Sequence, residues 1–214
     1  MPEATLPTVD ELKKLPLRAI VAYAVRCARR VQPLYVRASG IPFHQKHEAA
    51  LETALTIGEQ FCRGEPVAAD HATHAASVAS AAANAADEAY DAGAAAYDAA
   101  DAAAHAASAA DALNATKVAY ATKVLHVTKS AYAAIAAAAA AAAAYDTAEA
   151  AAHAAAHAAA AHNAVEAAAY ADAARVDYDR LVSLNLGAYP DLGQPIESGE
   201  NGPLGPLWPE RPTQ

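Results

Sequence analysis

The chain has 214 residues, a net charge of −9 and 55% hydrophobic residues, but only 6% of it is aromatic because alanine dominates the apolar fraction. This length fits one domain, or one domain with an appendage. The acidic balance argues against general nucleic-acid binding, which depends on neutralising phosphates, and two cysteines, Cys27 and Cys62, do not make a disulfide framework.

Residues 1–66 have ordinary globular composition and predict a short amphipathic helical front. Thr8-Val9-Asp10-Glu11 matches a capping box, and Pro16 suits the first turn of the next helix. The arginines of that helix, residues 17–31, fall largely outside its apolar face, which comprises Leu17, Ile20, Val21, Ala24, Cys27, Ala28 and Val31. After a loop at 39–42, a second amphipathic helix ends at the C-cap Gly64, and its core candidates are Leu51, Leu55, Ile57, Phe61 and Cys62.

The front is basic and the rest of the chain is acidic. Residues 1–63 contain nine Lys/Arg and six Asp/Glu, a net of +3, which leaves −12 for the remainder. Such asymmetry suggests a partner for the basic region. The nearest acidic surface is the chain's own second half, so we favour intramolecular pairing over an external acidic partner.

Residues 67–186 are dominated by alanine and predict long helices packed with the front as one domain. No proline lies between Pro66 and Pro190, and nine consecutive alanines occur in IAAAAAAAAAYD, residues 135–146. Alanine has the highest helix propensity, so such tracts need less support from packing than other compositions. The uncharged stretch between Lys129 and Asp146 has 16 residues, short of the ~20 apolar residues of a membrane span.

A polar seam runs along residues 70–108. Two files of positions, each with a seven-residue period, are polar at eleven of twelve places: Asp70, Ser77, Asn84, Asp91, Asp98 and His105 form one, and Thr73, Ser80, Asp87, Ala94, Asp101 and Ser108 the other. We expect the seam to face water and the alanines to pack, since buried carboxylates would need partners. The alternative is an assembly with the seam inside.

The last regions are a predicted long helix and an irregular tail. Residues 131–183 resemble one long helix with Gly187 as its stop. The alternative is a break inside this segment, although no Gly or Pro marks one. Residues 187–214, the C-terminal tail, are rich in Pro and Gly, and we expect an extended strap across the bundle with Trp208 as its anchor. The alternatives are a peptide presented to a partner's groove, or disorder.

The two ends of the chain resemble a known family. KLPLRAIVAYAVRCARRVQPLY and LNLGAYPDLGQPIESGENGPLGPLWPE are similar to the ends of an uncharacterised alanine-rich helical protein family of planctomycete bacteria. The resemblance implies a bacterial origin and a variable, alanine-dominated helical middle. It implies no activity, cofactor or catalytic residue. It directs attention to the arginines of the front and to Trp208.

Candidate sites are few. A weak metal-binding candidate is formed by three residues spaced four apart on one side of a helix: Glu149, His153 and His157. The alternative is that they are polar residues on the solvent-exposed face of an alanine-rich helix. The arginines Arg26, Arg29 and Arg30, together with Trp208, are partner-binding candidates, and pairing of the arginines with acidic residues of the alanine-rich helices is the alternative. No catalytic or cofactor-binding motif is found.

The sequence therefore predicts an all-α antiparallel bundle of long alanine-rich helices, with a short amphipathic front and an extended Pro/Gly-rich tail. The function that fits best is a non-enzymatic helical scaffold or protein-interaction module that binds a protein partner or self-associates, without nucleic acid or a cofactor. Alternatives are a phasin-like coat on a hydrophobic surface, an ice-binding helix protein and a weak metal-binding protein. MPEATLPT has neither a basic n-region nor an apolar h-region, so we expect a cytoplasmic location.

Overall fold

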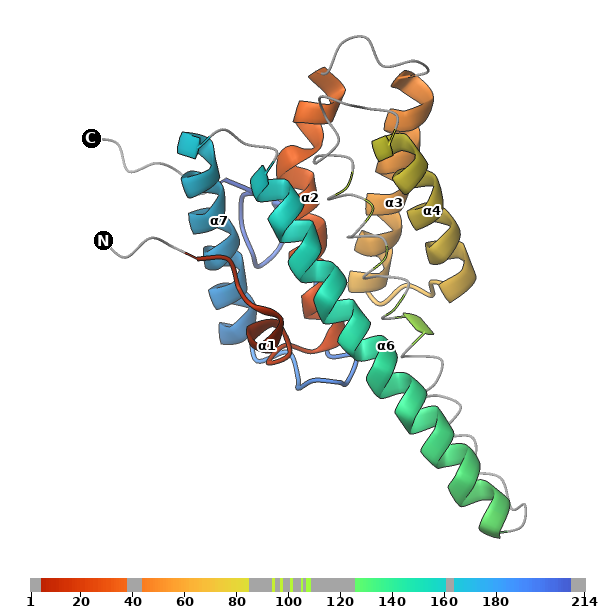
Figure 1. Cartoon of the computed structure of the whole chain (residues 1–214). Coiled ribbons are helices and arrows are strands. Elements are labelled where there is room, and N and C mark those ends of the chain that lie inside the picture. Colours follow the sequence, from red (N-terminus) through yellow and green to blue (C-terminus); the bar gives the residue numbers. More distant parts are fainter. Residues whose placement is uncertain are drawn as a thin grey trace.

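The computed structural model describes residues 5–37, 44–84, 94, 97, 101, 105, 107–108, 126–160 and 164–208. Within these residues the chain forms six helices and no strand, so the predicted all-α class is confirmed. Helix α2 (Leu17–Arg37) lies between the others (Figure 1). It packs against α3 (His44–Cys62), α6 (His126–Ala160) and α7 (Ala164–Ser183). Across the described part, no helix combines the length and the apolar composition that crossing a membrane requires.

The first helix begins at the predicted capping box. Helix α1 spans Val9–Leu12, with Thr8 as its N-cap. The Thr8 backbone N–H donates to Glu11 Oε2 at 2.9 Å, and the Glu11 N–H donates to Thr8 Oγ1 at 3.2 Å. Arg175 of α7 also donates to the Glu11 carboxylate, at 2.8 Å. The hydrogen bond from the Thr8 backbone, and then that from Arg175, lower the pKa of Glu11.

Helix α2 spans Leu17–Arg37, directly after Pro16. The first N–H groups of a helix lack partners within the helix, and here the C-terminal tail supplies them. The N–H groups of Leu17 and Arg18 donate to the carbonyls of Asp191 and Leu192, at 2.9 and 3.0 Å. The N-terminus of α2 is therefore capped by backbone carbonyls that lie about 175 residues later in the sequence.

The tail approaches the start of α2 closely, and a glycine permits this. Gly193 has a φ of +76°, and a Cβ placed on it would lie 2.6 Å from Cβ and Cγ of Pro16. That separation is far below van der Waals contact, so only glycine fits without a shift of the backbone. Arg18 Nη1 donates to the Gly193 carbonyl at 2.7 Å and fixes the contact.

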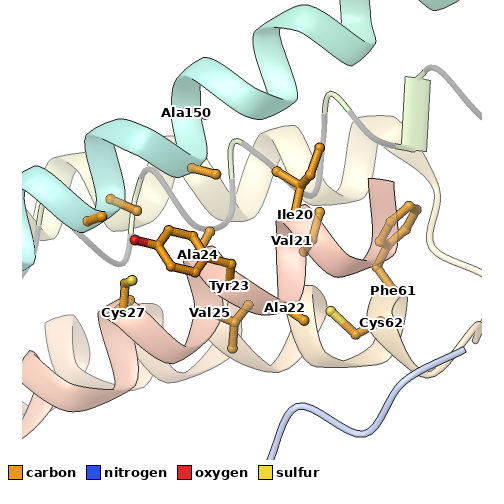
Figure 2. Close-up of a cluster of buried hydrophobic side chains, with 14 of the residues drawn as sticks. Ile20, Val21, Ala22, Tyr23, Ala24, Val25, Cys27, Phe61, Cys62 and Ala150 are labelled. Atoms are coloured by element: carbon orange, nitrogen blue, oxygen red, sulfur yellow. The ribbon is translucent and has the colours of Figure 1, made fainter. Parts of the chain in front are cut away.

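Helix α2 is buried on more than its predicted apolar face. The seven predicted core residues are all enclosed, but so are Tyr23, Val25 and Arg26. Figure 2 shows α2 between Ala150 of α6 and Phe61 of α3. The expectation that the arginines of this helix lie largely away from the packed surface is therefore wrong for Arg26 and Arg30, which are 0% and 3% exposed.

Helices α3 and α4 form a pair beside α2. Helix α3 spans His44–Cys62 and α4 spans Ala69–Asn84. Gly64, with a φ of +77°, follows α3 as predicted for a C-cap. The predicted loop at 39–42 lies outside the described residues. All five predicted core residues of α3 are buried: Leu51, Leu55, Ile57, Phe61 and Cys62.

The polar seam faces outward over residues 70–77, as predicted, and its next position, Ser80, is half-buried. Asp70, Thr73 and Ser77 are exposed. Four alanines of the same helix pack inward and are buried: Ala72, Ala75, Ala76 and Ala79. Small side chains let two helices approach closely and gain dispersion contacts that partly replace large apolar groups.

Further along the seam, the described positions are less exposed. Asp101, His105 and Ser108 are half-buried, and Ala94, the one alanine of the seam, is buried. The side chains of the remaining seam positions lie outside the described residues: Asn84, Asp87, Asp91 and Asp98. The seam thus approaches another part of the molecule at its C-terminal end.

Residues 131–183 do not form one long helix, and the break that the sequence left open is present. The chain forms α6, His126–Ala160, and α7, Ala164–Ser183, and these two helices pack against each other. Residues 161–163 lie outside the described part. The nine-alanine run lies inside α6, whose N-terminal end extends beyond the other labelled helices (Figure 1). Packing of α7 beside α2 buries Tyr170 and Leu181, which a continuous helix could not do.

The predicted helix end at residue 183 is confirmed, but Gly187 is not the residue that stops the helix. Helix α7 ends at Ser183, and the residue with a left-handed backbone is Asn185, with a φ of +47°. Asparagine adopts this conformation more readily than other non-glycine residues because its short polar side chain forms local hydrogen bonds. The chain therefore leaves the helix earlier than the position of the glycine suggests.

Candidate functional site

The buried charged side chains of the described structure lie where α2 faces α7. Arg26 and Arg30 are four residues apart, so they occupy one face of α2. That face meets Asp177 of α7, which is 1% exposed. Arg26 Nε lies 2.8 Å and Arg30 Nη2 lies 2.5 Å from the same carboxylate oxygen, Asp177 Oδ2. We call these three side chains the buried ionic cluster.

The cluster contains two guanidinium groups and one carboxylate, so it carries an excess positive charge. Burial is the largest single influence and would lower the pKa of Arg30. The charge of Asp177, the neighbouring Cys27 and the hydrogen bond to Asp177 together more than offset it, so that pKa is raised. A buried charge is costly unless paired and hydrogen-bonded. Backbone carbonyls supply the acceptors that the single carboxylate cannot.

Those carbonyls come from the C-terminal tail. Arg26 Nη1 donates to Ser198 O at 3.0 Å, and Arg26 Nη2 donates to Pro206 O at 2.9 Å. Arg30 Nε donates to Leu207 O at 2.7 Å. The two arginines therefore bind α7 and the tail at once, and each donor that binds the tail is fixed by a backbone atom, not by a tail side chain.

Other contacts hold the same tail along its length. The N–H of Ile196 donates to the carbonyl of Cys62 at 2.9 Å, and Arg180 of α7 donates to the carbonyl of Leu204. Ile196 and Leu204 are buried at 4% and 0% exposure. These two are the buried apolar side chains of the described part of the tail, residues 187–208, and they take the anchoring role that the sequence prediction assigned to Trp208.

Trp208 is 41% exposed. Its ring lies beside the cluster, with the Arg30 guanidinium carbon 6.0 Å from the ring centroid. This is the outer limit of a cation–π contact. Trp208 therefore lies beside Arg30 and is partly exposed.

Arg29 points to a different neighbour. Its Nη1 lies 2.6 Å from Glu52 Oε2, and its Nε lies 2.8 Å from Glu59 Oε1, both on α3. Burial would lower the pKa of Arg29, and hydrogen bonds to Glu52 and Glu59 raise it overall. The three predicted partner-binding arginines thus separate: two enter the buried ionic cluster, and the third joins α2 to α3.

A buried thiol lies on α2 between the two arginines of the cluster, directly after Arg26. Cys27 follows Tyr23 by four residues on α2, and Figure 2 shows the two side chains on neighbouring turns. Burial raises the pKa of the Cys27 thiol to about 11, and the charge of Arg30 only partly opposes this. Burial also raises the pKa of Cys62. Both cysteines are free, so the prediction that they are buried small apolar residues is confirmed.

The predicted metal-binding residues lie on the outer side of α6. Glu149 and His153 are exposed, and His157 is half-buried. The part of the chain that the structure describes contains no group of three His, Cys, Asp or Glu side chains arranged to hold a metal ion.

A second ionic contact involves a residue that the sequence analysis placed only on the seam. His105 Nε2 lies 3.4 Å from Asp101 Oδ2, and His105 Nδ1 lies 3.8 Å from Asp146 Oδ2 on α6. The four-residue spacing of Asp101 and His105 is a local signal that could have identified half of this contact. Asp146 could not be identified, because it is 41 residues from His105 in the sequence.

Comparisons with protein-family models, with curated proteins and with solved structures find no match for this chain. The family resemblance of its two ends therefore stays a prediction.

Proposed function

We propose that this protein is a non-enzymatic helical scaffold: an antiparallel helical bundle, closed by its Pro/Gly-rich tail, that presents one long alanine-rich helix for self-association. The observation that carries the proposal is the buried ionic cluster. It connects α2, α7 and the tail through charged hydrogen bonds of 2.5–3.0 Å. Such a cluster favours one fixed arrangement of the helices, which a scaffold requires.

The presented element is α6. Its 35 residues correspond to a rod of about 52 Å at 1.5 Å per residue. The C-terminal half of this rod is anchored on the body, because α6 packs against α2 and the alanines Ala144, Ala148, Ala151, Ala155 and Ala158 are fully buried. Their spacing of four and three residues is that of a coiled-coil seam.

The other half of α6 has the same composition. The spacing of the buried alanines continues backwards through Ala141, Ala137 and Ala134, and no charged residue lies between Lys129 and Asp146. Two copies of such a helix can approach without like-charge repulsion, and their small side chains permit close packing. We therefore expect a second copy of this chain as the partner.

Sedimentation velocity of the full chain from micromolar to submillimolar concentration tests the proposal. We expect a concentration-dependent dimer that Ala137→Glu weakens at least tenfold, because a charge would enter the helix pair. The matched control is Ala168→Glu, at an exposed alanine of α7, which should leave association unchanged. A monomer at all concentrations, or equal weakening by both substitutions, would contradict self-association through α6.

A further inference from the structure

The contact between His105, Asp101 and Asp146 joins the seam to α6. The three side chains are partly exposed, at 35%, 28% and 47% respectively. Both ring nitrogens of His105 face a carboxylate oxygen, one on its own segment and one on α6. Among the described residues, these two carboxylates are the charged groups that act on the imidazole.

This arrangement fits only one protonation state of the ring. A neutral imidazole has a hydrogen on one nitrogen and a lone pair on the other, whereas the imidazolium donates from both. In the neutral state one nitrogen lone pair would therefore face an anionic oxygen at 3.4 or 3.8 Å. Protonation replaces that repulsion with a second attraction.

We propose that His105 is a pH-dependent clasp that binds the seam to α6 while its ring is protonated and loosens when the ring is neutral. The distances from the two ring nitrogens to the carboxylate oxygens of Asp101 and Asp146 carry this inference. The direction of the His105 pKa shift agrees with them. The hydrogen bond to Asp101 raises the pKa of His105 above its ordinary 6.5, burial opposes the rise, and the charges of Asp101 and Asp146 add to it.

The direction of the pH effect follows from linkage. A group whose pKa is higher in the folded than in the unfolded state stabilises the folded state fully below the unfolded value. That contribution disappears as the pH rises through the folded value. The clasp is therefore closed below pH 6.5 and opens at higher pH, which makes the hold of the seam on α6 depend on proton concentration.

The test is an NMR titration of the full chain labelled with ¹³C-histidine, with His105→Gln identifying the His105 signal among nine histidines. We expect a midpoint above 6.5 and a downward shift of that midpoint in Asp146→Asn. The matched control is Glu149→Gln, an exposed carboxylate one turn further along α6, which should move the midpoint less. A midpoint at or below 6.5, or one unaffected by Asp146→Asn, would overturn the clasp.

Hydrogen exchange distinguishes loosening of the contact between the seam and α6 from an effect of the two carboxylates on the pKa of His105 alone. Protection factors of the amides around His105 should fall between pH 6 and pH 8.5 in the wild type and stay level in Asp146→Asn, a conservative change at a partly exposed site. Equal protection at both pH values in the wild type would also overturn the proposal, whatever the NMR midpoint.

Discussion

Replacing Asp177 by Asn tests the buried ionic cluster with the smallest change of shape. Asparagine keeps the size of the side chain but removes the charge that Arg26 and Arg30 share at 2.8 and 2.5 Å. Both guanidinium groups then stay enclosed without a counter-charge. Breaking a buried pair by removing one partner typically costs about 3–5 kcal/mol, because an uncompensated charge remains.

The hydrogen bonds of Asp177 give a similar value for the loss of unfolding free energy. Asp177 accepts two charge-assisted hydrogen bonds, and a hydrogen bond to a charged group contributes about 1.5–3 kcal/mol. In a chain of 150–250 residues, each kcal/mol moves the Tm by about 2–4 °C. We therefore expect Asp177→Asn to lower the Tm by roughly 6–20 °C, since about 3–5 kcal/mol of unfolding free energy is lost.

Urea denaturation followed by circular dichroism and by tryptophan fluorescence measures this loss. The chain has one tryptophan, and it lies beside Arg30, so its fluorescence reports the tail while circular dichroism reports the helices. The matched control is Asp179→Asn. Asp179 is 62% exposed and 3.5 Å from Arg175 Nε, and an exposed pair contributes about 0–1 kcal/mol.

A loss below about 1 kcal/mol in Asp177→Asn would refute the reasoning, because it would place the pair in the range of exposed ion pairs. Equal losses in Asp177→Asn and Asp179→Asn would refute it as well. Loss of the fluorescence transition alone, with the helical transition unchanged, would show that the cluster holds the tail but not the helices.

Three further substitutions test other contacts. Leu204→Ala should cost about 2–5 kcal/mol in urea denaturation because it removes a fully buried side chain of the tail, whereas Leu184→Ala, at 36% exposure, should cost under about 1 kcal/mol. Ala148→Leu should destabilise the fold by about 1–3 kcal/mol, because the larger side chain does not fit where α6 is enclosed. The same change at the exposed Ala142 should be near neutral. Equal effects would show that α6 does not pack through the face that contains Ala148. The capping hydrogen bonds lower the pKa of Glu11, so this residue stabilises the fold above its unfolded-state pKa of about 4.5, and the stabilisation is lost as the pH falls. Glu11→Gln should therefore flatten the acid side of a plot of Tm against pH. An unchanged plot would contradict the capping role.

Local features of the fold could be predicted from the sequence. The capping box of Thr8 and Glu11 forms as expected, because both partners lie within one turn. The buried faces of α2 and α3 follow from the spacing of their large apolar residues. Over residues 70–80 the alternation of polar residues and alanines shows which side of α4 is packed.

The buried ionic cluster could not be predicted in the same way. Arg26 and Asp177 are 151 positions apart, and Asp177 lies in a segment whose uniform alanine content conceals the boundary between α6 and α7. A surface-type residue such as arginine becomes enclosed only because α7 and the tail cover it. The charge asymmetry between the two halves of the chain was the one signal of this pairing.

The capping of α2 by distant residues has a consequence during synthesis. The carbonyls that complete its N-terminus and bind its arginines lie up to 180 positions later in the chain. At 5–20 residues per second, translation takes roughly 10–40 s to reach them. Throughout that interval the nascent helix displays its apolar residues and two uncompensated cations to the ribosome exit and to chaperones. This protein therefore completes its first large helix only after residues 191–207 have been synthesised.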